Sequence, residues 1–135
     1  MKLEIVKNAK LEPQQIETLR AAVGWNPLIG KYQTALEHSF AHYSIADSQE
    51  LIAFARVISD GAIYALIVDV MVHPEFQSRG LGSSFLKHIL EDLKLENIRS
   101  VNVIFEPKLE KFYQKLGFEV LMAGTQKTSK NQSIN

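Results

Sequence analysis

Apolar and polar residues follow two different periods along this chain, and these periods predict its strands and helices. Residues 63–72 are almost continuously apolar, which is typical of a strand buried on both faces. Pro74 marks the end of this strand, because proline has no N–H to give to a strand ladder. Residues 81–95 then carry apolar side chains at helical spacing, which predicts a helix after a short loop. The apolar face of that helix consists of Phe85, Leu86, Ile89, Leu90 and Leu93.

The N-terminal half predicts further strands and two helices. The predicted strands are 3–7, 42–46 and 51–59, and the predicted helices are 11–23 and 28–40. Pro13 lies near the start of the first helix, where its missing N–H costs nothing, and Gly24 is a plausible C-cap. Asp60-Gly61 predicts a tight turn into the long apolar strand. The middle of the chain should therefore be an antiparallel meander of three strands.

The C-terminal part predicts a strand, a helix and a final strand, at 101–105, 107–116 and 118–122. Because a helix connects the strand at 101–105 to the previous strand, the two should be parallel. The predicted order is β-α-α-β-β-β-α-β-α-β, a mixed α/β (α+β) arrangement that differs from a doubly wound Rossmann domain. We expect one domain over residues 1–122, followed by a polar C-terminal tail over 123–135 that frays.

Composition narrows the classes of protein to which the chain can belong. The 135 residues include 15 Lys and Arg against 15 Asp and Glu, so the net charge is zero. A balanced charge argues against a general nucleic-acid binder. No cysteine is present, which excludes a disulfide framework, a thiolate metal site and a cysteine nucleophile. The charged N-terminus does not resemble a signal peptide, and no apolar run approaches the roughly 20 residues of a membrane span. We therefore expect a soluble cytoplasmic protein that does not bind membranes.

The loop between the long apolar strand and the following helix has the pattern Gln77-x-x-Gly80-x-Gly82. A loop at a helix N-terminus leaves backbone N–H groups unpaired, and these groups and the helix dipole favour a phosphate. The two glycines allow the backbone to approach a ligand closely. No Gly-Lys-Ser/Thr follows, which argues against a nucleotide triphosphatase. Arg79 either pairs with a phosphate or is simply solvated.

A second motif, Phe112-Tyr113-x-x-Leu116-Gly117-Phe118, follows about thirty residues later. Tyr113 is either a half-buried packing residue or a phenol placed to protonate a leaving group. The two motifs in this order and spacing resemble the GCN5-related N-acetyltransferase (GNAT) superfamily, and the resemblance runs from the first strand to about Met122. It implies a mostly antiparallel mixed sheet of six to seven strands with about four helices.

The resemblance also implies acetyl-CoA as the cosubstrate, no metal, and a set of site residues. The cofactor arm would pair with the backbone of Val70, Met71 and Val72. The other residues implied to bind the cofactor are Gln77, Ser78, Arg79, Gly80, Leu81, Gly82, Ser83 and Phe112. The residue matching Tyr113 commonly protonates the departing thiolate in this family. Direct transfer of this kind needs no cysteine nucleophile.

Two features depart from the family pattern. Glu106 stands where many members carry Asn, and Leu109 stands where a small residue is frequent. Members of the family also usually end in a hairpin, yet no good apolar strand follows Met122. The seventh strand is therefore short, absent or supplied by a partner chain, and an open final strand makes a homodimer plausible.

The general base and the acceptor are less constrained by the sequence. Candidates for the base are Asp69, His73, His42, Glu106 and His38. Asp69 is the preferred candidate, because it is one carboxylate in an otherwise apolar strand. It is either a substrate-facing catalytic group or the partner of a structural hydrogen bond. Trp25 and Tyr32 either line the acceptor pocket or hold their loop to the core.

The hypothesis that follows is an N-acetyltransferase that moves an acetyl group from acetyl-CoA to a primary amine of a small molecule or peptide. A non-catalytic CoA-binding regulatory domain is the alternative, and Glu106 leaves room for it.

Overall fold

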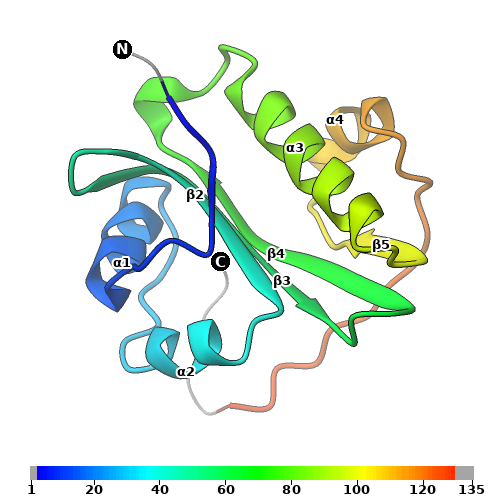
Figure 1. Ribbon diagram of the computed structural model, residues 1–135, viewed down its shortest axis with the longest axis horizontal. Helices are drawn as coiled ribbons and strands as arrows, with labels where there is room; N and C mark the ends of the chain where they lie inside the picture. Colours follow the sequence, from blue (N-terminus) through cyan, green and yellow to red (C-terminus); the bar gives the residue numbers. More distant parts are fainter. Residues whose placement is uncertain (1–2, 130–135) are drawn as a thin grey trace.

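The computed structural model describes residues 3–129, which form one five-stranded sheet flanked by helices (Figure 1). The strands are β1 (Val6–Lys7), β2 (Ala41–Asp47), β3 (Glu50–Ser59), β4 (Tyr64–Val72) and β5 (Ser100–Val103). The helices are α1 (Pro13–Ala22), α2 (Tyr32–Glu37), α3 (Leu81–Leu95) and α4 (Glu110–Lys115), with short 3₁₀ turns at Pro74–Phe76 and Pro107–Leu109. The strands lie side by side in chain order, from β1 to β5.

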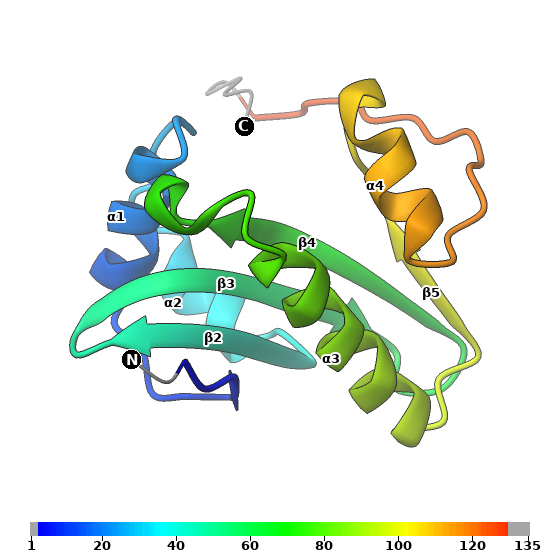
Figure 2. The same cartoon turned by 90° about the horizontal axis from the view of Figure 1, so that it is seen from above.

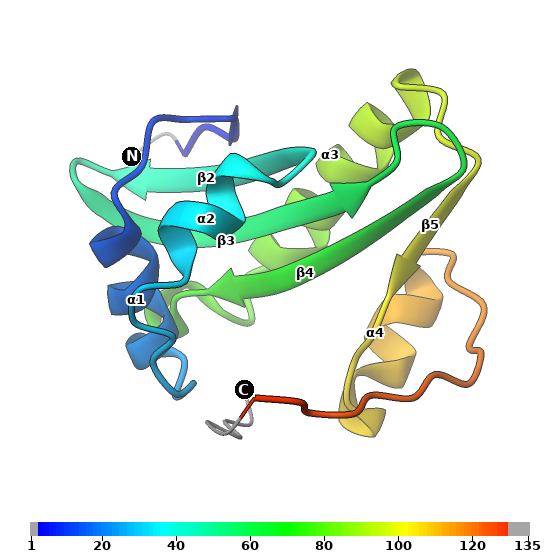
Figure 3. The ribbon, with the colours of Figure 1, turned by 90° about the horizontal axis from the view of Figure 1, so that it is seen from below.

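The sequence correctly predicted the antiparallel meander and the parallel pair at its edge. β2, β3 and β4 pair antiparallel, whereas β4 and β5 are parallel. α1 and α2 pack on one face of the sheet around Phe54 and Met71. α3 covers the other face with Phe85 and Ile89, so the sheet is buried between two layers (Figures 2 and 3).

The predicted count of six to seven strands is wrong for the described residues, where five are found. Residues 118–122 form no strand there, and neither do residues 123–129; the rest of the tail lies outside the described residues. Val120, Leu121 and Met122 are 44%, 73% and 102% exposed, so these apolar side chains bury little surface. β5 is only four residues long, which leaves a short template for another strand.

β4 carries an irregularity at the point where it separates from β5. Its pairing with β3 shifts register, so that Asp69 and Val70 lie opposite the single residue Ala55. This is a β-bulge, and Asp69 adopts a left-handed backbone with φ 56°. Pairing with β5 ends at Ile67, although β4 continues to Val72. The far end of β4 therefore has one edge that is not paired with β5 (Figure 2).

Candidate functional site

The loop after β4 is held in an unusual backbone conformation. Ser78 and Gly80 both have positive φ, at 63° and 77°, and α3 begins directly afterwards at Leu81. The Gln77 side-chain amide donates to the Val72 carbonyl oxygen at 2.8 Å, which closes the loop onto the end of β4. Seven of the predicted cofactor residues, 77–83, thus lie in this loop and in the first turn of the helix.

An open groove of about 430 Å³ runs beside this loop. The Arg79 guanidinium lies 5.6 Å from the centre of the Phe76 ring, which holds the cation next to the groove. The groove is lined by Leu3, Phe76, Arg79, Gly80, Leu81 and Ser84. Of the residues that line the groove, Leu3, Phe76 and Ser84 were not among the predicted site residues. Leu3 is distant in sequence, and no motif marks it.

Gly82 is the point where the two sequence motifs meet. A Cβ atom at this position would lie 3.7 Å from Val72 Cγ2 and 3.8 Å from Phe112 Cζ. The end of β4, the first turn of α3 and the helix α4 therefore come together at one small residue. The sequence predicted both motifs, and the structure brings them together.

The unpaired edge of β4 presents backbone groups to the gap between β4 and β5. The His73 N–H donates to the Ile52 carbonyl oxygen of β3 at 2.7 Å. Because N–H groups alternate in direction along a strand, those of Val72 and Val70 face away from β3, towards the gap. The backbone N–H of Met71 points towards β3 instead. The Met71 side chain is buried, with 1% exposed. Of the three predicted strand residues, Val70 and Val72 are thus the ones with backbone groups at the gap.

Tyr113 lies on α4 among three phenylalanine rings. Its ring stacks on Phe105 at 4.6 Å and meets Phe112 and Phe118 edge-on at 5.1 and 5.7 Å. The residue is 4% exposed, yet no hydrogen bond to its hydroxyl is found among residues 3–129. Burial raises the pKa of the phenol above its usual 10.0, so the hydroxyl keeps its proton at neutral pH. This is the state that a proton donor requires.

A left-handed glycine fixes the end of α4 and so the position of Tyr113. Gly117 has φ 95°, its N–H donates to the Gln114 carbonyl, and the Phe118 N–H donates to the Tyr113 carbonyl. These two bonds form a Schellman motif, which brings the Phe118 ring onto Tyr113.

Asp69 lies in an ion-pair network on the opposite face of the sheet from α3. Its Oδ2 accepts a hydrogen bond from Arg56 Nε at 2.6 Å, and its Oδ1 lies 3.9 Å from Arg20 Nη1. Arg20 is fully buried on α1 and was not predicted from the sequence. Its position four residues after Ile16, on the apolar stripe of the helix, is the signal that could have revealed it.

Trp25 and Tyr32 contact this buried arginine. The Arg20 guanidinium lies 5.3 Å from the Trp25 ring centre, and its Nη1 donates to the Tyr32 hydroxyl at 3.1 Å. Tyr32 is 2% exposed, and burial together with the Asp69 carboxylate raises its pKa to about 12. These contacts match the structural alternative considered for the two residues, in which they hold their loop to the core.

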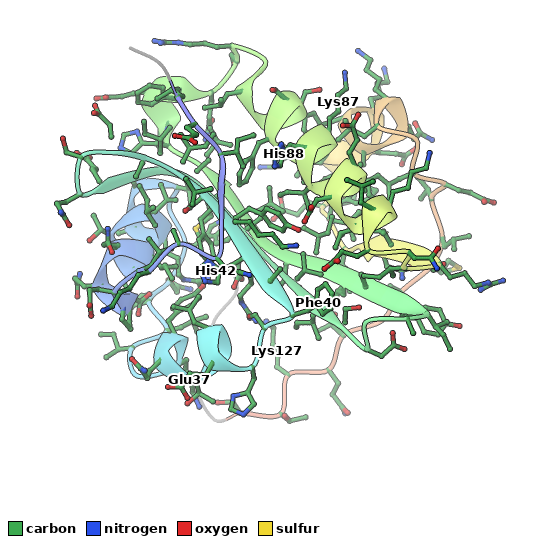
Figure 4. The ribbon with its side chains drawn as sticks, viewed as in Figure 1. Glu37, Phe40, His42, Lys87, His88 and Lys127 are labelled. Atoms are coloured by element: carbon green, nitrogen blue, oxygen red, sulfur yellow. The ribbon has the colours of Figure 1, made fainter. Side chains whose placement is uncertain are left out.

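The other base candidates are spread over the molecule. His73 Nδ1 accepts a hydrogen bond from the Glu75 N–H, and Glu106 forms an exposed ion pair with Lys108 at 3.4 Å. His42 projects from β2 (Figure 4), where its Nδ1 is buried without a partner in the described residues and burial lowers its pKa. The structure does not gather these groups into one cluster.

Residues 3–129 contain neither a cluster of metal-binding side chains nor a helix that could span a membrane. No group of His, Cys, Asp or Glu side chains in this part of the chain could hold a metal ion. Across the same residues, no helix has the length and apolar character needed to span a bilayer.

The sequence is similar to known acetyltransferases. A family model described as an acetyltransferase (GNAT) domain matches residues 38–120. The uncharacterized N-acetyltransferase ycf52 of Gracilaria tenuistipitata var. liui is 36% identical, over 82% of this chain and 64% of the relative. The chloroplastic GCN5-related N-acetyltransferase 1 of Arabidopsis thaliana is also 36% identical, over 80% of this chain and 56% of the relative. The chain thus spans less than two thirds of the length of these two proteins.

Solved structures agree with the fold. A GNAT-family acetyltransferase from Streptococcus pneumoniae superposes with a TM-score of 0.75 and 26% identity, covering 96% of this chain and 100% of that one. The resemblance extends beyond the two motifs to the arrangement of strands and helices.

Proposed function

Because the chain belongs to the GNAT superfamily, we propose that it transfers an acetyl group from acetyl-CoA to a primary amine of a small molecule or peptide. The observation that carries this proposal is the meeting of the two motifs at Gly82, between Val72 and Phe112. This contact supports Tyr113 as the proposed proton donor, because its helix α4 meets the end of β4 there.

The residues at this corner fit a CoA ester. The N-terminus of α3 and the loop before it offer backbone N–H groups to a pyrophosphate, and Arg79 adds a positive charge beside the groove. A Cβ at Gly80 would meet nothing within 4 Å, so the backbone here is open to a ligand. The N–H and C=O groups of Val70 and the N–H of Val72 would orient the amide-containing arm.

The chemistry needs an electrophile, a proton donor and a proton acceptor. Acetyl-CoA supplies the thioester carbonyl, which a neutral amine can attack directly. The N–H groups of Val70 and Val72 can polarise a carbonyl oxygen placed at the gap. Tyr113 holds a proton that it can give to a departing thiolate, because burial keeps its phenol in the neutral form. The base that receives the proton of the amine stays a prediction.

The test is a thiol-release assay with acetyl-CoA across amino acids, polyamines, aminoglycosides, arylamines and peptide N-termini. Tyr113→Phe should keep acetyl-CoA affinity while lowering turnover by about a hundredfold or more, the range of general acid catalysis. Tyr64→Phe, at an exposed tyrosine of β4, is the matched control and should behave as wild type.

Two outcomes would contradict the proposal. Equal turnover of Tyr113→Phe and wild type would leave Tyr113 with a packing role only. Binding of acetyl-CoA without thiol release for any amine would favour the CoA-binding regulatory domain, for which the exposed Glu106 is the supporting feature.

A further inference from the structure

The position of Asp69 is unfavourable for a carboxylate without stabilising partners. It is the bulged residue of β4, its backbone is left-handed, and its side chain is only 9% exposed. Aspartate tolerates this backbone better than most residues do, but a buried carboxylate still needs compensation. The compensation comes from two other elements of the fold.

Both carboxylate oxygens face a guanidinium. Arg56 approaches Oδ2 from β3 at 2.6 Å, with its side chain 18% exposed. Arg20 approaches Oδ1 from α1 at 3.9 Å, with its side chain fully buried. The bulge is therefore tied to the neighbouring strand on one side and to the covering helix on the other.

Arg20 extends the same network to the linker between α1 and α2. Its Nε and Nη2 donate to the Asn26 carbonyl oxygen at 2.9 and 2.7 Å. Its Nη1 donates to the Tyr32 hydroxyl, at the start of α2. A single buried side chain thus connects the α1–α2 linker to the residue at which β4 bulges.

The bulge lies at the point where the gap between β4 and β5 begins. β4 and β5 are last paired at Ile67 and Val103, and Asp69 follows two residues later. The backbone groups of Val70 and Val72, which face the gap, come directly after the bulge. Their direction depends on the conformation of Asp69, because an inserted residue sets the orientation of every peptide that follows it.

We propose that Asp69 is a positioning residue, which Arg56 and Arg20 hold so that Val70 and Val72 face the arm of acetyl-CoA. This inference rests on the proposed function. A general base must offer an oxygen to the acceptor, whereas both oxygens of Asp69 are directed at guanidinium groups. The network makes Arg20 and Arg56 part of cofactor recognition, although neither needs to contact the ligand.

The experiment compares Asp69→Asn and Arg56→Gln with two controls. Asparagine also tolerates a left-handed backbone, so Asp69→Asn removes the charge without adding strain. Asp47→Asn, at an exposed position of β2, controls for loss of a carboxylate. Tyr43→Phe controls for lower stability alone, because it removes a hydrogen bond to Asp92 on the α3 side of the sheet. Acetyl-CoA affinity is measured by calorimetry at a temperature at which circular dichroism shows each variant folded.

Asp69→Asn and Arg56→Gln should both weaken acetyl-CoA binding by about tenfold or more, since the first removes the charge that pairs with both arginines and the second breaks the pair with Arg56. The two controls should bind as wild type. The turnover number at saturating acetyl-CoA should change much less than the affinity, and the pH profile should keep its shape. In the protein without ligand, the amide NMR signals of Val70 and Val72 should move in both variants and in neither control.

Three results would overturn the inference. Unchanged affinity and unchanged amide signals in both variants would leave Asp69 with no influence on the strand. Loss of turnover and of the acidic limb of the pH profile in Asp69→Asn, with Arg56→Gln unaffected, would identify Asp69 as the base. Wild-type protein that binds no acetyl-CoA would remove the proposed function itself, and this outcome is distinct because it does not depend on the variants.

Discussion

Gly80 and Gly82 lie two residues apart, yet replacing each by alanine should change stability in opposite directions. Gly80 has φ 77°, and a Cβ there would meet no atom within 4 Å, so the only penalty is the left-handed backbone. This penalty is about 1 kcal/mol. Gly82 lies in the first turn of α3 without a positive φ, and its Cβ would make ordinary contacts at 3.7 and 3.8 Å. Alanine there should gain about 0.5–1 kcal/mol.

Thermal unfolding can resolve this difference. For a chain of 135 residues, 1 kcal/mol corresponds to about 4 °C in the melting temperature. Gly80→Ala should therefore melt about 4 °C below wild type, and Gly82→Ala about 2–4 °C above it. Scanning fluorimetry or calorimetry without ligand measures both shifts.

Acetyl-CoA should reverse the ranking for Gly82→Ala. The added methyl group points at Val72 and Phe112, the corner where the cofactor is proposed to pass, so we expect about tenfold weaker affinity. At saturating acetyl-CoA, wild type should gain more in melting temperature than Gly82→Ala does. A lower melting point for free Gly82→Ala would refute the packing argument. Equal ligand-induced shifts in the two proteins would refute the assignment of this corner to the cofactor.

Two further predictions concern stability alone. Burial opposes ionisation of Asp92, but hydrogen bonds from Lys7 and Tyr43 outweigh this effect and lower its pKa. Its stabilising contribution is therefore present above the unfolded pKa and is lost as pH falls through the lower folded pKa. In urea titrations, wild type should lose more stability than Asp92→Asn on acidification below about pH 4. Leu121→Ser and Met122→Ser should each change the free energy of unfolding by less than about 0.5 kcal/mol, because both side chains are exposed. A loss of 2 kcal/mol, roughly that of a buried apolar side chain, would instead support the strand predicted at 118–122.

The parts of the fold that the sequence predicted correctly are those with a repeating pattern. α3 shows four buried residues at helical spacing, and the turn at Asp60-Gly61 separates two long strands. The final strand was predicted from its apolar residues alone. A strand also needs a partner edge. β5 is only four residues long, and Val120 to Met122 are exposed. Whether a segment has such an edge is decided by the rest of the fold.

The candidate site was predictable to a similar extent. The loop and the Phe112-Tyr113 pair were found because each is a local motif, and their roles stay predictions. The lone carboxylate of Asp69 in an apolar strand indicated that it needs a partner. No local pattern identified Arg56 or Arg20, which lie 13 and 49 positions away in the sequence. A one-residue bulge leaves no trace in a continuous run of apolar residues. The network that surrounds Asp69 could therefore be seen only in three dimensions.

The bulge also changes which residues of β4 share a face of the sheet. Before it, Ala65 and Ile67 belong to the core under α3, whereas after it Val70 and Val72 pack against that same core. The strand thus changes from odd to even positions at Asp69. If Asp69 were paired as a regular strand residue, strict alternation would turn Val70 and Val72 towards α1. Deleting Asp69 would instead remove the bulge and leave both valines facing α3. For this strand, the presence of one extra residue at position 69 matters as much as the identity of that residue.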